Sequence, residues 1–208
     1  MKKTLAKIIE KIHETPVAKK QIREIAKDPC WAYEYAKDVI DGRWPDAEPI
    51  IAKNPRWAYQ YAASVIGGRW PKGEPVIAKN LRWAYWYATN VIGGRWPDAE
   101  SIFAEDPDWA FDYAEEVVRG RFPKGEPVIA KDPAWAYKYA RDIIGGRFPE
   151  AEKYIAKEPK FAHWYARDVI GGRWPCAEST IAKDPEQAYW YARDVLKRPW
   201  PEAGIYEL

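Results

Sequence analysis

Cysteine and histidine are scarce in this sequence of 208 residues. It has two cysteines, Cys30 and Cys176, and two histidines, His13 and His163. None of the four lies in a CxxC pair or in a cluster with the spacing of metal ligands. We therefore expect no metal site and no cofactor.

A charge imbalance and long apolar runs are also missing. Lysine and arginine total 33 against 31 aspartates and glutamates, so no strong field attracts nucleic acid or anionic lipid. No apolar run approaches the ~18 residues of a transmembrane helix. The N-terminal segment MKKTLAKIIEKIHE has the pattern of an amphipathic helix and not of a signal peptide. The sequence predicts a cytoplasmic protein with no membrane partner.

Aromatic residues, proline and glycine are abundant by contrast, and they recur at a fixed interval. Trp31 and Trp57 are 26 residues apart, and the same interval separates successive copies of the pattern D/N-P-x-W-A-Y-x-Y-A-x-x-V-I-x-G-R-W-P-x-A-E-x-x-I-A-K. Phe161 and Gln187 take the place of this tryptophan in the last two copies. A fixed interval of this length is the signature of a repeat architecture.

Each copy predicts two helices. Helix A starts at Asp28-Pro29, because aspartate caps an N-terminus and proline suits the first helical position. The same pair recurs, with Glu158-Pro159 among its copies and Asn80-Leu81 as the exception. Helix A ends at Gly42 and its equivalents, where we expect glycine to be required for a left-handed conformation. Helix B starts at Pro45 or at Pro49, and both starts stay open.

Units of 26 residues cannot bury an apolar face alone, so neighbouring units must stack. We predict an all-α fold, an α-solenoid that forms a right-handed superhelix of short two-helix repeats with N- and C-terminal caps. Residues 1–28 are the N-terminal capping helices, residues 29–198 six full repeats and one degenerate repeat, and residues 199–208 the C-terminal cap, together one continuous domain. Unless the array closes on itself, Cys30 and Cys176 lie too far apart for a disulfide.

The recurrent tryptophans and tyrosines have two interpretations, as core or as a stacking platform for bases or sugars. On a helical wheel, the apolar residues of helix A cover an arc of about 200° from Trp31 to Tyr33, more than a one-sided surface helix needs. Such an arc fits a helix that packs against its own helix B and against both neighbouring units. We interpret these aromatic residues as core.

Arginine and glutamate recur five residues apart, across the turn between the helices. The glutamate falls on the inward side of helix B, where a carboxylate requires a partner. The alternative is a row of arginines that bind phosphate groups. We predict a structural ion-pair ladder formed by Arg43 and Glu48, Arg69 and Glu74, Arg95 and Glu100, Arg121 and Glu126, Arg147 and Glu152, and Arg173 and Glu178.

The residue between the two tyrosines of W-A-Y-x-Y varies from copy to copy: Glu34, Gln60, Trp86, Asp112, Lys138, Trp164 and Trp190. We call these positions the variable ridge. The ridge lies in the middle of the polar arc of helix A, so its tryptophans are predicted to be exposed. Exposed aromatic residues are typical of partner surfaces, and packing over a neighbouring repeat is the alternative. We predict a partner-binding surface that contains Trp86, Trp164, Trp190, His163, Lys138 and Asp112.

No nucleophile, acid or base stands apart from the repeat, so the sequence predicts no catalytic residues and no enzyme. We expect a module that binds a protein partner. Single-stranded nucleic acid is the disfavoured alternative, because residues 104–120 carry six acidic side chains in the middle of the chain. A self-assembling structural protein is a further alternative. The oligomeric state is left open.

The run WAYxYAxDVIGGRWPxAEPxIAKDP resembles tandem-repeat hypothetical proteins of tailed bacteriophages and bacteria over residues 25–201. The resemblance implies no established activity and no functional residues. It does imply a place of action, inside an infected bacterium, where the protein would bind a host or defence protein as an inhibitor or adaptor.

Overall fold

The computed structural model describes residues 16–208, and these residues are helical apart from turns and short links. Within this range, β-type pairing is confined to an isolated antiparallel bridge between Trp200 and Ile205. The all-α prediction is confirmed. The chain divides into two units, residues 1–96 and residues 97–208, and each is described by itself.

Every repeat contributes one A helix, which begins as an α-helix and ends in a π-helical turn. The A helices are α3 Pro29–Tyr35 with η1 Ala36–Ile40, α5 Pro55–Tyr61 with η2 Ala62–Ile66, α7 Leu81–Tyr87 with η3 Ala88–Ile92, α9 Pro107–Asp112 with η5 Tyr113–Val118, α11 Pro133–Lys138 with η6 Tyr139–Ile144, α13 Pro159–Tyr165 with η7 Ala166–Ile170, and α15 Pro185–Tyr191 with η8 Ala192–Leu196.

Between the A helices lie the shorter B helices: α4 Glu48–Ile51, α6 Glu74–Ile77, α8 Glu100–Phe103 with the 3-10 turn η4 Pro97–Ala99, α10 Glu126–Ile129, α12 Pro149–Ile155 and α14 Pro175–Ile181. In α4, α6 and α10 the second residue is a proline, which lacks the N–H that an earlier start would need. In α12 and α14 this proline is absent, and the helix begins three residues earlier in the repeat. The second proline therefore decides where helix B starts.

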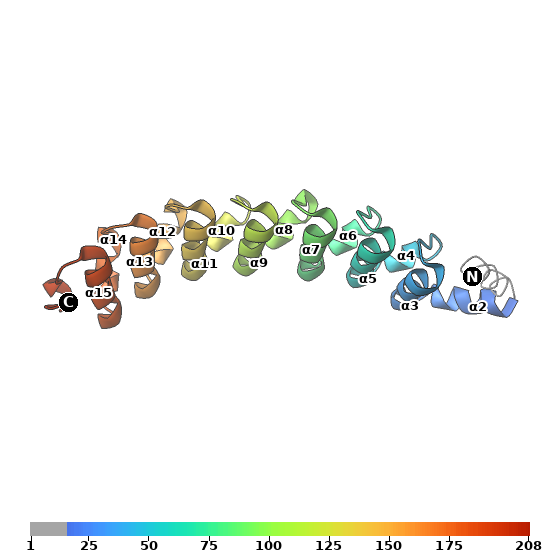
Figure 1. Ribbon diagram of the computed structural model, residues 1–208, viewed down its shortest axis with the longest axis horizontal. Helices are drawn as coiled ribbons and strands as arrows, with labels where there is room; N and C mark the ends of the chain where they lie inside the picture. Colours follow the sequence, from blue (N-terminus) through green and yellow to red (C-terminus); the bar gives the residue numbers. More distant parts are fainter. Residues whose placement is uncertain (1–15) are drawn as a thin grey trace, which may run out of the picture. The chain divides into compact units, whose positions relative to one another are not determined.

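The repeats stack side by side within each unit. In the first unit α3 contacts α5 and α5 contacts α7, and in the second unit α9, α11, α13 and α15 contact one another in the same order (Figure 1). Within each unit the A helices α3, α5, α9, α11 and α13 also pack against the B helices that follow them. This stacking of paired helices is the predicted α-solenoid architecture. The sense of its superhelix and its continuity as one domain stay predictions.

The N-termini of the A helices are capped as the sequence predicts, with one exception. Asp28 Oδ1 accepts hydrogen bonds from the backbone N–H groups of Cys30 and Trp31 at 2.9 and 3.0 Å. Equivalent side-chain caps are made by Asn54, Asn80, Asp106, Asp132 and Asp184. Glu158 makes no side-chain cap, so that prediction was wrong. Glutamate has one methylene more than aspartate, which is unfavourable for this short-range bond.

The prediction for the C-terminus of helix A was also wrong. The left-handed residue is the one before the expected glycine: Asp41, Gly67, Gly93, Arg119, Gly145, Gly171 and Lys197 have φ between 55° and 71°. Gly68, at the expected position, has no left-handed φ, and an added Cβ would meet no atom within 4 Å. The N–H groups of Gly93 and Gly94 both bond to the carbonyl of Ala88, which closes the π turn. Closure by this turn shifts the left-handed position by one residue.

The core lies between the A and B helices and contains two of the recurrent aromatic positions. The second tyrosine of W-A-Y-x-Y is fully buried from the second repeat onward, and the aromatic residue of R-W/F-P is buried in every copy. The first tryptophan is different: Trp31 is 66% exposed, and Trp57, Trp83, Trp109 and Trp135 are half-buried. The core prediction is therefore wrong for this tryptophan, which lies at the edge of the apolar arc.

The ends of the chain differ in what the structure describes. At the N-terminal end α2 Pro16–Ile25 contacts α3, whereas the predicted amphipathic helix over residues 1–14, with His13, lies outside the described residues. At the C-terminal end the 3-10 turn η9 Pro201–Ala203 takes the place of helix B. There Trp200 is buried with its ring 5.4 Å from that of Tyr191. Trp200 thus covers the last A helix.

Candidate functional site

The exposed side of the A helices carries ring pairs that join neighbouring repeats. The first tyrosine of one repeat faces the first tryptophan of the next, with 5.4 Å between the rings of Tyr33 and Trp57 and 5.6 Å between those of Tyr59 and Trp83. In the second unit Phe111 and Trp135 are 5.1 Å apart. These pairs hold adjacent A helices together by aromatic packing.

The same tyrosines form a hydrogen bond to the π turn of the next repeat, 31 residues along the chain. The hydroxyl of Tyr33 lies 3.0 Å from Ser64 Oγ, and the Tyr59 hydroxyl accepts a bond from Asn90 Nδ2 at 3.1 Å. In the second unit the hydroxyl of Tyr137 donates to Asp168 Oδ2 at 2.6 Å. Where this position is a tyrosine, it therefore supplies both a ring and a polar end to the junction, whereas Phe111 supplies a ring alone.

The junction of α13 and α15 departs from this scheme at both members of the ring pair. His163 stands where the other repeats have tyrosine or phenylalanine, and Gln187 stands where they have tryptophan or phenylalanine. Here His163 Nδ1 lies 3.1 Å from Gln187 Oε1. Its Nε2 lies 3.9 Å from Asp194 Oδ2. A hydrogen bond between two smaller side chains thus replaces a pair of stacked rings.

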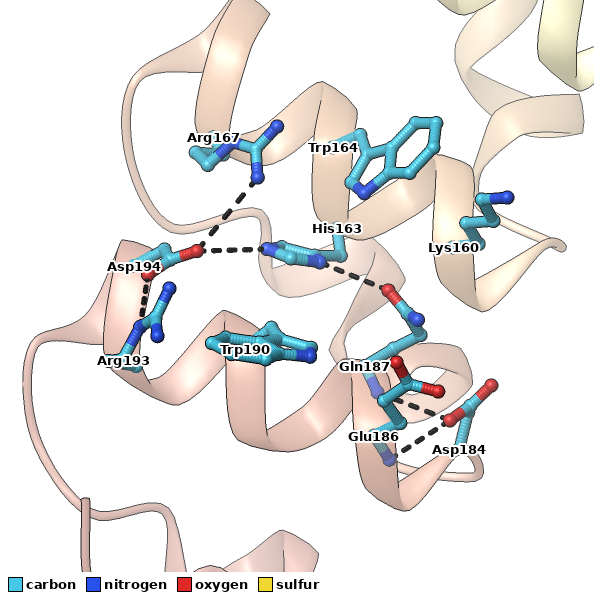
Figure 2. Close-up of a pocket in the computed structure, with 10 residues that line it drawn as sticks. All are labelled: Lys160, His163, Trp164, Arg167, Asp184, Glu186, Gln187, Trp190, Arg193 and Asp194. Atoms are coloured by element: carbon cyan, nitrogen blue, oxygen red, sulfur yellow. Dashed lines mark hydrogen bonds and ion pairs between the residues drawn. The ribbon is translucent and has the colours of Figure 1, made fainter.

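A surface cavity of about 660 Å³ opens at this junction, within the second unit. In Figure 2 the imidazole of His163 lies between the indole of Trp164, drawn above it, and that of Trp190, drawn below. The cavity is lined by Lys160, His163, Trp164, Arg167, Asp184, Glu186, Gln187, Trp190, Arg193 and Asp194. Three of the residues predicted for partner binding therefore meet in one place. Trp164 and Trp190 are half-buried, and the ring of Trp164 lies 5.6 Å from that of Tyr137 in the preceding repeat. The prediction that the ridge tryptophans are exposed is therefore wrong for these two and confirmed for Trp86.

Charges of both signs surround the indoles. Lys160 Nζ lies 4.7 Å from the ring centre of Trp164, and the guanidinium carbon of Arg193 lies 3.9 Å from that of Trp190. Arg193 also bonds to Asp194 at 2.7 Å, and this contact is the main cause that lowers the pKa of the Asp194 carboxyl. Three cations and three carboxylates line the cavity, so its rim is close to neutral, with Lys160 and Arg193 over the two indoles and Arg167 beside Asp168.

His163 is the most buried polar residue of the cavity, with 2% of its surface exposed. Burial lowers the pKa of its imidazole, so the ring is neutral at pH 7. In the tautomer that donates from Nδ1 to the amide oxygen of Gln187, Nε2 carries a lone pair. Nε2 has no hydrogen-bond partner among the described residues.

The remaining predicted residues lie elsewhere. Trp86 belongs to the first unit, where its indole is 45% exposed and meets Tyr85 edge-on at 5.8 Å. In the second unit Lys138 Nζ lies 4.0 Å from the ring centre of Trp135. Burial raises the pKa of the half-buried Asp112, and Asp108 and Glu116 add to that rise. None of these three lines the cavity at His163.

Sequence reasoning missed Gln187, Arg193 and Asp194 as members of this site. Gln187 and His163 each break the repeat pattern, but they belong to different copies. The repeat alignment could have revealed the link between them, because the first tyrosine of one copy contacts the first tryptophan of the next copy. Two breaks at paired positions mark a changed junction.

The predicted ion pairs form on the opposite side of the A helices. In five copies the arginine makes two hydrogen bonds of 2.7–2.9 Å to its glutamate, which is at most 17% exposed: Arg43 with Glu48, Arg69 with Glu74, Arg121 with Glu126, Arg147 with Glu152, and Arg173 with Glu178. Arg95 belongs to the first unit and Glu100 to the second, so that pair stays a prediction. The other five arginines have their carboxylate partners.

A tyrosine hydroxyl links each of these pairs to the next repeat. Tyr61 accepts a 2.7 Å bond from the backbone N–H of Trp44 and donates to Glu48 at 3.4 Å. In the second unit Tyr165 does the same for Phe148 at 2.6 Å and Glu152 at 3.1 Å. Burial is the main cause that raises the pKa of Tyr165 to about 12. The protonated hydroxyl is therefore a fixed part of each junction.

The chain matches no protein-family model, no curated protein and no solved structure. Every helix in residues 16–208 is too short or too polar to cross a lipid bilayer. In the same residues, no three His, Cys, Asp or Glu side chains come together in a group that could hold a metal ion. Cys30 and Cys176 are free thiols.

Proposed function

We propose that this protein is a non-enzymatic repeat module that binds another protein through the A-helix side of the array. The observation that carries the proposal is the contrast between the two sides of the A helices. One side repeats the same ion pairs and tyrosine bridges, whereas the variable ridge changes from copy to copy and holds Trp86, Trp164 and Trp190. A constant scaffold with surface side chains that differ from copy to copy is how repeat proteins present a binding surface.

The cavity between α13 and α15 is the strongest candidate for the centre of that surface. It contains two tryptophans and two arginines, the residue types that contribute most to protein interfaces. Its charges are mixed, which suits a protein partner with patches of both signs better than a phosphate backbone. The ladder arginines add little to phosphate binding, because five of them are held by glutamates.

The resemblance of the repeat to phage and bacterial proteins supports a narrower proposal. The partner would be a host or defence protein, and the site of action the bacterial cytoplasm. The exposed thiol of Cys176 is compatible with this reducing compartment.

An affinity pull-down from bacterial cytosol tests the proposal. We expect the wild-type chain to capture a protein that the double variant Trp164→Ala/Trp190→Ala fails to capture, with helical content and melting temperature nearly unchanged. Trp31→Ala removes an exposed tryptophan from the first repeat and should retain the partner.

Three results would contradict the proposal. A large drop in melting temperature for the double variant would assign its tryptophans to packing. Capture that disappears after nuclease treatment of the lysate, and that weakens steeply with salt, would indicate single-stranded nucleic acid. Large species of the purified chain in light scattering, with no captured protein, would indicate self-assembly.

A further inference from the structure

The core beneath the α13–α15 junction is the same as at the other junctions. The backbone N–H of Trp174 bonds to the hydroxyl of Tyr191 at 2.8 Å, as the N–H of Trp44 bonds to that of Tyr61. The A helices are therefore held by the same contacts while the ring pair on their exposed side is replaced by smaller side chains. The space that two large rings would fill stays open, and the cavity lies at this place.

The hydrogen bond that normally completes the junction is also missing at α13–α15. Tyr137 donates its phenol proton to Asp168 Oδ2 at 2.6 Å, and the equivalent positions in the next repeat are His163 and Asp194. The imidazole is shorter than a phenol, and its Nε2 stops 3.9 Å from Asp194 Oδ2. Nε2 and Oδ2 are both acceptors, and Nε2 is buried without a partner among the described residues. The described residues therefore leave a hydrogen-bond donor to be supplied at this site.

The other lining groups restrict what that donor can be. Lys160 and Arg193 already lie over the two indoles, and Arg167 lies 3.9 Å from Asp194, so a further cation would be repelled. Asp194 and Glu186 disfavour an anion at the same place. A neutral planar ring that carries one O–H or N–H group meets both the shape and the charge of the cavity.

We infer that the α13–α15 cavity binds the side chain of a tyrosine or a tryptophan from the protein partner, whose O–H or N–H donates to His163 Nε2 or Asp194. This inference rests on the proposed function for the source of the ring. The partner would supply the ring and the donor that Tyr137 supplies at the preceding junction. The cavity is thus a place where the repeat pattern is completed by another molecule.

The first test uses p-cresol, which has the ring and hydroxyl of a tyrosine side chain, titrated into the full chain with isotope-labelled tryptophan and histidine. We expect saturable NMR shifts at Trp164, Trp190 and His163 and none at Trp31. 4-Methylanisole has the same ring without the O–H donor and should bind about tenfold more weakly. Shifts that do not saturate, that lie elsewhere, or that are equal for both compounds would overturn the inference.

The second test restores the repeat pattern with His163→Tyr/Gln187→Trp. We expect this variant to melt at or above the wild-type temperature and to bind p-cresol at least about tenfold more weakly, because its own rings fill the cavity. Unchanged p-cresol affinity in the folded variant would overturn the inference. If the double variant fails to fold, Gln187→Trp alone, which restores one ring, carries the same expectation for p-cresol.

The two proposals fail in different experiments. Absence of p-cresol binding overturns the cavity assignment and leaves the pull-down result unaffected. Saturable p-cresol binding without any captured protein supports the chemistry of the cavity and contradicts the proposed protein partner. Captured protein that His163→Tyr/Gln187→Trp also captures contradicts the role of the cavity in that interaction.

Discussion

At the scale of single residues, the tyrosine hydroxyl that joins two repeats is the most consequential polar group of the scaffold. Tyr165 satisfies the buried N–H of Phe148 and contacts Glu152, and both of these residues belong to the preceding repeat. Water has little access to either partner, because Phe148 is buried and the side chain of Glu152 is 17% exposed. One oxygen atom therefore joins a backbone group and an ion pair.

Replacing this hydroxyl tests its contribution to stability. We expect Tyr165→Phe to lower the free energy of unfolding by about 1–3 kcal/mol, because it leaves a buried N–H without an acceptor. Denaturant unfolding followed by circular dichroism measures the change. Tyr206→Phe, at a residue that is 73% exposed, is the matched control and should change nothing. Equal effects of the two variants would refute this role of the hydroxyl.

Some residues of the cavity could be predicted from the repeat sequence, and others could not. His163, Trp164 and Trp190 stand out because each departs from its register or from the polar arc of its helix. Gln187 and Asp194 were not predicted as site residues, since they meet His163 from positions 24 and 31 residues away. Such contacts depend on how one repeat seats against the next. A single helical wheel contains no information about that distance or direction.

At the scale of the helix, the π-helical turn decides where glycine is required. The carbonyl of Ala62 accepts from the N–H groups of both Gly67 and Gly68, and only Gly67 is left-handed, with φ of 71°. The sequence alone suggested the reverse assignment, because the second glycine is the more regular of the two. The position that is most often glycine is therefore not the position with the left-handed backbone. Asp41, Arg119 and Lys197 occupy the left-handed position in their repeats, at some cost in conformational energy.

Two alanine substitutions in the same turn separate these assignments. We expect Gly67→Ala to lower the free energy of unfolding by about 1 kcal/mol, because a Cβ is unfavourable at a left-handed φ. Gly68→Ala should change it by less than about 0.5 kcal/mol, since its Cβ would meet no atom and its φ is not left-handed. Thermal and urea unfolding compare the two variants. A larger loss for Gly68→Ala would contradict the observed turn.

Helix starts were more predictable than helix ends. An aspartate or asparagine cap acts within three residues, so its geometry follows from local sequence, and the caps at Asp28 and its equivalents form as expected. The exposure of the first tryptophan was not predictable in the same way. Trp31 and Trp57 lie at the edge of the apolar arc, where the neighbouring repeat and not the wheel decides burial.

At the scale of the whole molecule, each repeat is bonded mainly to the repeats before and after it. A deletion of residues 55–80 removes one period and joins Asn54 to Leu81, two residues that already stand in sequence register. We expect this variant to keep the helical circular dichroism signal per residue and to unfold cooperatively, because it restores a junction between equivalent surfaces. Its melting temperature should fall only modestly.

The control for this deletion removes residues 55–67, half of a period. This change removes α5 with η2 and puts the B helix α6 where a helix A is required, and we expect loss of helical signal or of cooperative unfolding. If both deletions are equally damaging, the repeats are not interchangeable units. If neither is damaging, the 26-residue register does not determine the stacking.

The hydrogen bonds of the bridging tyrosines also set the order in which the junctions between repeats can form during synthesis. A protein leaves the ribosome with its N-terminal end first, and each repeat exposes an unsatisfied backbone N–H and a glutamate until a hydroxyl arrives from the following repeat. For Trp44 that hydroxyl is on Tyr61, 17 residues later. Synthesis therefore completes the repeats one after another, each newly made repeat closing the one before it, and Tyr191 closes the junction at Trp174 in the same way.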